Sequence, residues 1–503
     1  MRISLLVEMV SDALGDRVIL GPRTGGMTAG ELLDRARRAA AWAHERHGER
    51  FCYVGVNSEA VPVALLASSL CGRPFVPLNF RLADDRLRDI AVRVAPAVAV
   101  VDEGVADRIG PVEGLEVIER DAFLEVCREH PADLPEEEPS EEIAVLLFTS
   151  GTTGEPKGAI LRHLNLTSYV VGTVEFLGAG EEEAALVSVP PYHIAGLMSI
   201  LTSLYAGRRL VYLPVFDPEQ WVDLARDEAI TQAMVVPTML GRILDVLEKR
   251  GEKLPALRSL SYGGGRMPVS VIERALRDLP EVNFTNAYGL TETSSTVAVL
   301  TPEDHRVAAA SPDPAVHRRL GSVGRPIPTL ELVVRDPATG AEMPPGEVGE
   351  ICVRGDQVSG EYIGRDDKDA DGWFRTRDAG WLDEDGYLYV EGRLDDVIVR
   401  GAENMSPGEI EEVLLEHPAV KEAAVVGVPD DEWGEHVGAV VVLHEGASAT
   451  DEELRQWVRA RLRSSRTPQE IEFREELPYN ETGKLLRRVI KEELSALAAG
   501  GSR

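Results

Sequence analysis

The pattern of hydrophobic and polar positions in the first third of the chain alternates between helical and strand periods. An amphipathic helix is predicted over 27–48, where Thr28 and Glu31 have the spacing of a capping box and apolar residues follow at helical intervals. Buried strands are predicted from three short apolar runs: 51–56, 74–79 and 97–103. Such alternation indicates a largely parallel sheet covered by helices.

The pattern changes twice further along the chain. Alternation resumes over 180–290, and from about 320 the sequence becomes rich in strand patterns and Gly/Pro turns. After 392–407 a new helix–strand alternation begins, in a tail of about 110 residues that is large enough for its own core. We therefore predict an α/β protein. It would have a large N-terminal domain (1–394) of helix-covered sheets plus a β-rich subdomain, and a small mobile α+β C-terminal domain (395–503).

Charge and cysteine usage narrow the class of protein. With 53 Lys and Arg against 85 Asp and Glu, the net charge is −32, which argues against a nucleic-acid partner or an anionic membrane surface. The four cysteines form no CxxC pair, so neither a zinc site nor a disulfide framework is indicated, and a cytoplasmic protein is expected. No apolar run approaches the ~18 residues of a membrane helix, so no integral membrane association is expected.

The most suggestive short stretch is LLFTSGTTGEPKGAI (146–160), which resembles a phosphate-binding loop. It departs from the P-loop pattern G-x-x-x-x-G-K-[ST], because two residues separate Gly154 from Lys157 and Gly158 stands where the hydroxyl should be. Pro156 also disfavours running from this loop straight into a helix. Small residues and successive N–H groups can still enclose an anion, whereas the alternative is a flexible Ser/Gly/Thr turn. Taken alone, the stretch supports both interpretations.

Five further stretches follow in a characteristic order. Together with TSGTTGEPKG (149–158), they are PPYHIAG (190–196), NAYGLTETSS (286–295), GWFRTRDAGWLDEDGYLYVEGRLDD (372–396), GAENMSPGEIEEVL (401–414) and LPYNETGK (477–484). This set resembles the adenylate-forming superfamily of acyl- and aryl-CoA synthetases, luciferases and peptide-synthetase adenylation domains. The resemblance covers nearly the whole chain and favours the anion-binding interpretation of the loop.

The resemblance implies a two-step reaction that uses ATP, Mg²⁺ and coenzyme A. A carboxylate attacks the α-phosphorus of ATP to give acyl-AMP and pyrophosphate, and a thiol then displaces AMP to give a thioester. The two steps would use one site in two orientations of the C-terminal domain, with a hinge at Asp395. The oligomeric state stays open, a homodimer included.

The resemblance also assigns residues to the nucleotide. Its phosphates would be held by the opening loop: Thr149, Ser150, Gly151, Thr152, Thr153, Gly154 and Lys157. Tyr288 would offer an aromatic face to adenine, Thr291 a hydroxyl to the α-phosphate, and Glu292 an oxygen ligand to Mg²⁺. The segments bordering adenine would be Gly263, Gly264 and Gly265, and Asn286, Ala287 and Gly289. Without the family context these strings predict only turns and a helix cap.

Two residues resemble the ribose contacts. Asp378 would take both hydroxyls, a role that suits an acceptor-only carboxylate, and Arg393 would join it. The alternative is a surface Arg–Asp pair, which is common in so charged a chain.

Two residues are implied at the reacting groups. Lys484 would bridge the acyl carboxylate and the α-phosphate as charge develops between them. His193 would lie near the carboxylate and the approach of the thiol, although a histidine in an apolar run is more often structural.

The predicted acyl pocket indicates the substrate class. Peptide-synthetase adenylation domains hold an amino acid with an Asp where PYHIAG stands, and no acid lies between Pro190 and Ala206 here. The expected lining is apolar and partly small: Ala195, Gly196, Leu197, Met198, Pro237, Met239 and the glycines 263–265. A hydrophobic acyl, aryl or polycyclic carboxylic acid is therefore expected.

Fewer residues indicate which thiol accepts the acyl group than indicate the nucleotide site. Trp433 matches a position that packs near CoA in aryl-CoA ligases, and Arg466 is the one base in 464–469, where relatives carry several. Arg81 could add a phosphate contact. The alternatives are a ligase that loads the phosphopantetheine of a carrier protein, and a non-catalytic adenylate-binding module.

Overall fold

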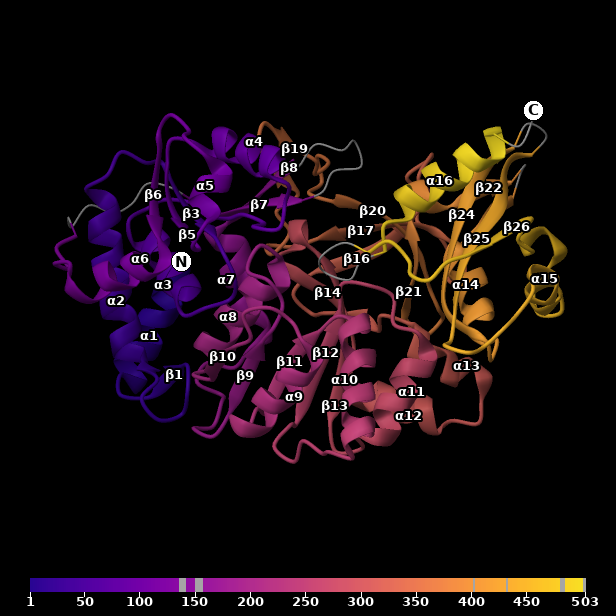
Figure 1. Ribbon diagram of the computed structural model, residues 1–503, viewed down its shortest axis with the longest axis horizontal. Helices are drawn as coiled ribbons and strands as arrows, with labels where there is room; N and C mark the ends of the chain where they lie inside the picture. The colour runs from indigo at the N-terminus through magenta and orange to yellow at the C-terminus, as the bar shows by residue number, and fades with distance from the viewer. Residues whose placement is uncertain (135–141, 150–156, 401–402, 431–432, 480–484, 501–503) are drawn as a thin grey trace.

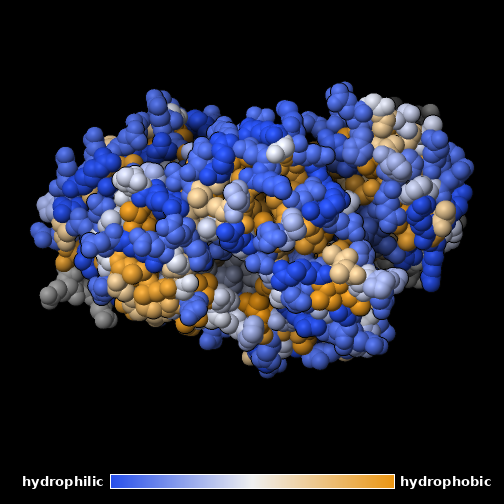
Figure 2. All heavy atoms as spheres, turned by 90° about the horizontal axis from the view of Figure 1, so that it is seen from below, coloured by the Kyte–Doolittle hydropathy of each residue, from blue (hydrophilic) through white to orange (hydrophobic). Residues whose placement is uncertain are grey.

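The computed structural model describes residues 1–134, 142–149, 157–400, 403–430, 433–479 and 485–500. Figure 1 shows the N-terminal part at one end of an elongated molecule, the middle of the chain below the centre, and the C-terminal lobe at the other end. The face seen in Figure 2 is mostly hydrophilic, with apolar patches toward the N-terminal side. No helix in the described ranges is both long and apolar enough to cross a membrane.

The first sheet lies in the N-terminal third and has helices on both faces. In spatial order its strands are β19 (Arg365–Asp366), β18 (Glu361–Tyr362), β8 (Lys157–Arg162), β7 (Ile143–Thr149), β4 (Phe75–Pro77), β3 (Arg50–Val54), β5 (Ala97–Val101) and β6 (Leu115–Glu119). Its helices are α1 (Ile3–Leu14), α2 (Ala29–His44), α3 (Ala60–Leu70), α4 (Asp84–Val94), α5 (Val105–Ile109) and α6 (Arg120–Glu129). Successive residues of β3 alternate between the two cores: Phe51 packs with the α1–α3 side and Cys52 with α4 and α5. The predicted helix-covered sheet is confirmed as largely parallel: β7, β4, β3, β5 and β6 pair in parallel, whereas β8, β18 and β19 continue it in antiparallel fashion.

The second sheet contributes part of one face, from β11 and β12, to a cleft. In spatial order its strands are β15 (Arg325–Pro326), β14 (Ser295–Leu300), β13 (Asn283–Leu290), β12 (Ser259–Gly263), β11 (Gln232–Val235), β9 (Ala184–Val187), β10 (Arg209–Tyr212), β1 (Val18–Leu20) and β2 (Met27–Thr28). Helices around it are α7 (His163–Thr173), α8 (Ile194–Tyr205), α9 (Pro218–Asp227), α10 (Pro237–Arg250), α11 (Val269–Asp278), α12 (Pro302–Ala310) and α13 (Pro314–His317). Val235 and Leu260 point into the core beneath α9–α11, whereas Met234 and Ser261, on the opposite face, line a cleft.

A smaller antiparallel sheet forms the β-rich region predicted from about 320. Its strands, in spatial order, are β16 (Glu331–Arg335), β17 (Gly349–Arg354), β20 (Phe374–Leu382) and β21 (Leu388–Arg393). In β20 and β21, Asp378 pairs in register with Arg393.

The C-terminal lobe has a sheet of its own. Its strands are β23 (Glu403–Met405), β22 (Ile398–Arg400), β25 (Gly434–Leu443) and β24 (Val420–Asp430), with β26 (Glu470–Phe473) parallel to β25. Helices α14 (Pro407–Leu415) and α15 (Asp451–Arg459) pack on one face, and α16 (Arg487–Gly500) packs on the other. Both cores of this lobe draw their described residues from positions after 397. The mixed α/β fold class is confirmed, while the boundary at Asp395 and the mobility of the lobe stay predictions.

Candidate active site

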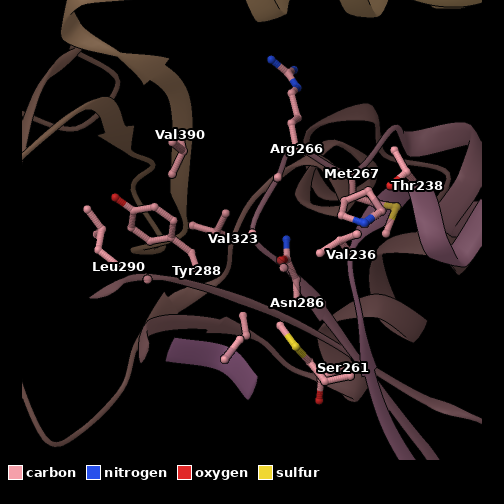
Figure 3. A pocket seen from close by; sticks show the side chains of 18 of the residues that line it. Val236, Thr238, Ser261, Arg266, Met267, Asn286, Tyr288, Leu290, Val323 and Val390 are labelled. Atoms are coloured by element: carbon pink, nitrogen blue, oxygen red, sulfur yellow. The ribbon is translucent and has the colours of Figure 1, made fainter. Parts of the chain in front are cut away.

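A cleft of about 3270 Å³ is lined by residues of the second sheet, the antiparallel sheet and the C-terminal lobe. Tyr288 and Asp378 contribute to its walls from before Asp395, and Glu412 and Arg487 contribute from after it. Figure 3 shows part of this region, with Tyr288 between Leu290 and Val323 and with Val390 nearby. The cleft therefore brings together segments that are far apart in the sequence.

The opening loop joins two antiparallel strands rather than a strand and a helix. Thr149 ends β7 in register with Lys157, the half-buried first residue of β8. The strand that follows Pro156 agrees with the prediction that no helix begins there. An added Cβ at Gly158 would lie 2.6 Å from Ile363 Cδ1, the end of an exposed side chain that would have to turn away. The remaining predicted phosphate contacts lie outside the described residues: Ser150, Gly151, Thr152, Thr153 and Gly154.

Asp378 is the centre of a hydrogen-bonded cluster at the cleft. Tyr288 Oη donates to Asp378 Oδ2 at 2.6 Å, and Arg393 Nη1 donates to Asp378 Oδ1 at 2.9 Å. Arg393 also donates to the Thr376 carbonyl at 2.7 Å. Asp378 is 8% exposed, so this is a held carboxylate and not the surface pair considered as the alternative. Burial, with a contribution from the Asp378 charge, raises the pKa of Tyr288 well above its ordinary value.

Glu292 is a second buried carboxylate on the cleft. It lies in a short 3₁₀ turn, Thr291–Thr293, and both Thr291 and Glu292 line the cleft. Tyr362 Oη donates to Glu292 Oε1, and the Ser359 N–H donates to the Glu292 carbonyl at 2.8 Å. Burial and the adjacent Glu292 charge raise the pKa of Tyr362. The backbone and one carboxylate oxygen are thus fixed from β18 and the segment before it.

The described residues contain no group of three or more His, Cys, Asp or Glu side chains that could hold a metal by themselves. Mg²⁺ is commonly held by one or two carboxylates together with substrate phosphates and waters. One carboxylate at Glu292 fits that mode and does not fit a site made entirely of protein ligands.

Glycines bring the backbone edges of β12 and β13 close together. A Cβ at Gly263 would lie 2.2 Å from the Ala287 carbonyl oxygen, and Gly264 has φ +78°. On β13, a Cβ at Gly289 would lie 1.6 Å from the Ser295 carbonyl oxygen. These positions exclude larger residues for reasons of packing, and Gly263, Gly264 and Gly265 also line the cleft.

Asn286 and Ala287 line the same part of the cleft, but the Asn286 side chain is already engaged. Its Nδ2 donates to the Ser322 carbonyl at 3.1 Å, and the residue is 7% exposed. This contact fixes β13 against the turn before β15, a structural role that accompanies the predicted one.

Helix α8 forms one wall of the cleft, and only some of its predicted acyl-pocket residues line that wall. His193 caps the helix at the cleft, with its ring centroid 4.8 Å from that of Tyr192. Leu197 is 1% exposed and packs in the core on the other side of the helix, so its assignment to the pocket was wrong. Gly196 is likewise buried, against the Pro190 carbonyl. The predicted residues that do line the cleft are Ala195, Met198, Pro237, Met239 and the glycines 263–265.

Two hydroxyl residues complete this wall and were not predicted. Ser199 Oγ donates to the Ala195 carbonyl at 2.7 Å, and Thr202 Oγ1 donates to the Met198 carbonyl at 2.6 Å. Because their protons are used within the helix, both residues offer small and weakly polar surfaces to the cleft.

Of the three site residues predicted in the C-terminal lobe, one lines the cleft, one lies away from it, and one lies outside the described residues. Lys484 lies outside the described residues, but its neighbours Tyr479 and Leu485 form a β-bridge and line the cleft. Arg466 also lines the cleft and is paired with Glu409. Trp433 is 47% exposed and does not contribute to the lining in this orientation of the lobe.

The fold and the cleft define an adenylate-forming enzyme. The chain belongs to the AMP-binding enzyme family: that family matches residues 9–363, and the AMP-binding enzyme C-terminal domain matches residues 409–484. The resemblance found in the sequence is thereby confirmed.

Three relatives illustrate the range within the family. A feruloyl-CoA synthase from an Amycolatopsis species is 35% identical, with 92% of this chain and 94% of that protein covered. A fatty acid–acyl-carrier-protein ligase from Streptomyces coeruleorubidus is 33% identical, with coverages of 88% and 86%. The solved o-succinylbenzoate CoA synthetase of Bacillus subtilis, in complex with its acyl-adenylate intermediate, has a TM-score of 0.82 at 29% identity and 97% coverage of both chains. The same enzyme is also known in complex with ATP and magnesium ion.

Proposed function

We propose that this protein is an ATP-dependent acid–thiol ligase that activates a hydrophobic carboxylic acid as acyl-AMP and transfers the acyl group to coenzyme A. The observation that carries the proposal is the Tyr288–Asp378–Arg393 cluster, a buried carboxylate held by two donors at the wall of the cleft. Vicinal hydroxyls of a ribose are donors, and a carboxylate has about four lone-pair sites, so it can accept them while keeping both existing bonds.

The nucleotide would lie between this cluster and the glycine edges of β12 and β13. Gly263 approaches the Ala287 carbonyl too closely for a side chain, and Gly263, Gly264, Gly265 and Tyr288 all line the cleft, a combination that suits a planar base. The phosphates would extend toward Thr291, Glu292 and the loop after β7. When bound, Mg²⁺ neutralises phosphate charge, and Glu292 is the carboxylate that would hold it.

In the first step a carboxylate oxygen of the acid forms a bond to the α-phosphorus of ATP. The bond from that phosphorus to the bridging oxygen breaks, and pyrophosphate leaves with the electron pair. In the second step the thiol sulfur bonds to the acyl carbon, AMP leaves, and the thiol proton is released to solvent or base. Lys484 is proposed to stabilise the charge between carboxylate and α-phosphate in the first step.

The wall along α8 supports the substrate class. Ala195, Met198, Ser199 and Thr202 present small or apolar surface, and the two hydroxyls are occupied by their own helix. The hydroxyl oxygens keep lone pairs but carry no charge, and none of these four residues has a carboxylate that would balance a buried ammonium, which disfavours amino acids.

A second candidate function is the loading of a carrier protein. It is favoured by the 33% identity to the fatty acid–acyl-carrier-protein ligase. A non-catalytic adenylate-binding module is disfavoured, because Glu292 and Asp378 are both retained and both lie on the cleft.

The test is pyrophosphate release from ATP and Mg²⁺ with a panel of acids: ferulate, 2-succinylbenzoate, decanoate and phenylalanine. We expect release with at least one of the first three and none above background with phenylalanine. Release with no acid of a wider panel would refute the ligase, and efficient turnover of phenylalanine would refute the pocket assignment.

A further inference from the structure

Glu350 is a buried carboxylate that the proposed mechanism does not use. It lies on β17, is 2% exposed, and does not line the cleft as far as the described residues define it. Its Oε2 accepts from Arg375 Nε at 2.6 Å, and its Oε1 accepts from the backbone N–H of Arg377 at 3.2 Å. A buried carboxylate is costly unless it is paired and hydrogen-bonded, and Glu350 is both.

The contact to Arg377 falls at a bulge in the adjacent strand β20. One residue of β17, Ile351, lies there opposite three residues of β20: Thr376, Arg377 and Asp378. Thr376 Oγ1 donates to the Ile351 carbonyl at 2.8 Å and accepts from the Asp378 N–H at 3.1 Å. Bulges often re-aim a side chain beside an active site, and Asp378 is the residue of this bulge that lines the cleft.

Arg377 has a left-handed backbone conformation within the bulge, with φ +61°. A residue with a Cβ atom rarely adopts a positive φ, because the Cβ crowds the following carbonyl oxygen. The Arg377 side chain is exposed, so its burial does not enforce the conformation. The hydrogen bond from its N–H to Glu350 does restrain the backbone at this residue. Because Asp378 comes next, a change in the backbone angles of Arg377 would swing the Asp378 carboxylate away from its two donors.

We propose that Glu350 is a positioning residue for nucleotide binding. By holding the Arg377 N–H, it keeps the bulge in the conformation that points the Asp378 carboxylate at the cleft. The ion pair with Arg375 in turn holds the Glu350 carboxylate in place. The inference rests on the proposed function, because it takes Asp378 as the acceptor of the ribose hydroxyls.

The test measures the Kd for ATP in the presence of Mg²⁺ and without an acid, using the full-length protein with substitutions at Glu350. Glu350→Asp keeps the charge but withdraws the carboxylate by the length of a carbon–carbon bond, about 1.5 Å, which takes the 3.2 Å contact to Arg377 out of hydrogen-bond range. Glu350→Gln keeps the length and one acceptor oxygen but loses the charge. We expect Glu350→Asp to raise the Kd about tenfold, and Glu350→Gln to raise it less than about threefold.

Two substitutions outside the cleft serve as controls. Arg375→Met removes the ion-pair partner and leaves the bond to the Arg377 N–H. Because the Arg375 side chain is 55% exposed, this variant should change the Kd for ATP less than about twofold. Glycine adopts a positive φ without steric cost, so adding Arg377→Gly to Glu350→Asp should bring the Kd back to within about threefold of the wild-type value.

The inference would be overturned if Glu350→Asp bound ATP as tightly as the wild type, or if Glu350→Gln weakened binding more than Glu350→Asp. An effect of Arg375→Met as large as that of Glu350→Asp would also overturn it. Pyrophosphate release tests the ligase separately: its absence with every acid, alongside the expected order of Kd values, would refute the ligase and leave the role of Glu350 in place. A wild-type protein that does not bind ATP would refute both.

Discussion

Replacing Asp378 by Asn separates the proposed ribose contact from the stability of the site. The amide oxygen can still accept from Arg393, and the Tyr288 hydroxyl can turn to accept from the amide nitrogen, so both partners at 2.9 and 2.6 Å keep a bond. The charge is lost, and one of the two oxygens that could accept a ribose hydroxyl becomes a donor.

A hydrogen bond to a charged group contributes about 1.5–3 kcal/mol, which corresponds to roughly 10–150-fold in affinity. We therefore expect Asp378→Asn to raise the KM for ATP in pyrophosphate release by at least about tenfold, with the thermal midpoint close to that of the wild type. The KM for the acid should change much less, because the acid lies at the other end of the nucleotide.

The control is Asp304→Asn. Asp304 accepts from Tyr387 Oη at 2.6 Å, the same bond as that between Tyr288 and Asp378, but it does not line the cleft. It should leave the KM for ATP unchanged. If Asp378→Asn also leaves this KM unchanged, or if both variants raise it equally, the ribose assignment is wrong.

Four further predictions follow from the site and the core. Glu292→Gln should lower pyrophosphate release at least tenfold and raise the Mg²⁺ concentration needed for half-maximal rate; an unchanged Mg²⁺ titration would reject the metal role. Gly263→Ala should destabilise the protein by about 1–3 kcal/mol in thermal unfolding and weaken ATP binding, because the new Cβ would lie 2.2 Å from the Ala287 oxygen; wild-type stability would contradict the close approach. Lys484→Ala should slow acyl-AMP formation about 10²–10³-fold yet convert synthetic acyl-AMP and CoA at a near wild-type rate; equal loss in both assays would contradict its placement in the first step alone. Burial lowers the pKa of His163 from 6.5 to about 4. Between these two pH values the unfolded chain binds a proton that the folded chain does not, so the free energy of unfolding falls as the pH falls, by about 3 kcal/mol at most. His163→Asn should remove this loss of stability when denaturant unfolding is compared at pH 7 and pH 4.5, and an unchanged difference between the two pH values would argue against the buried neutral histidine.

Local sequence patterns predicted helices and strands well where the residues that start or end an element all lie in one short segment. The capping box at Thr28 and Glu31 is present with both reciprocal hydrogen bonds, and α2 begins at Ala29 as expected. Pro156 disfavoured a helix directly after the loop, and β8 begins at the next residue, Lys157.

The side of an element that faces the cleft was harder to predict. Leu197 and Met198 are adjacent apolar residues on α8, yet one is in the core and the other lines the cleft. A helix rotates by about 100° per residue, and nothing in the local sequence says which side of a wholly apolar helix another sheet will cover.

The sequence by itself determined the elements, the fold class and the family of this protein, because propensity, capping and motif order act within a few residues of the chain. Only the tertiary structure decided which distant side chains meet. Tyr288 bonds to Asp378 across 90 positions, Tyr362 bonds to Glu292 across 70, and Arg400 reaches Ser465 across 65. Each of these contacts depends on how separate sheets and turns pack together, and a single sequence records neither the distance nor the direction of such a pair.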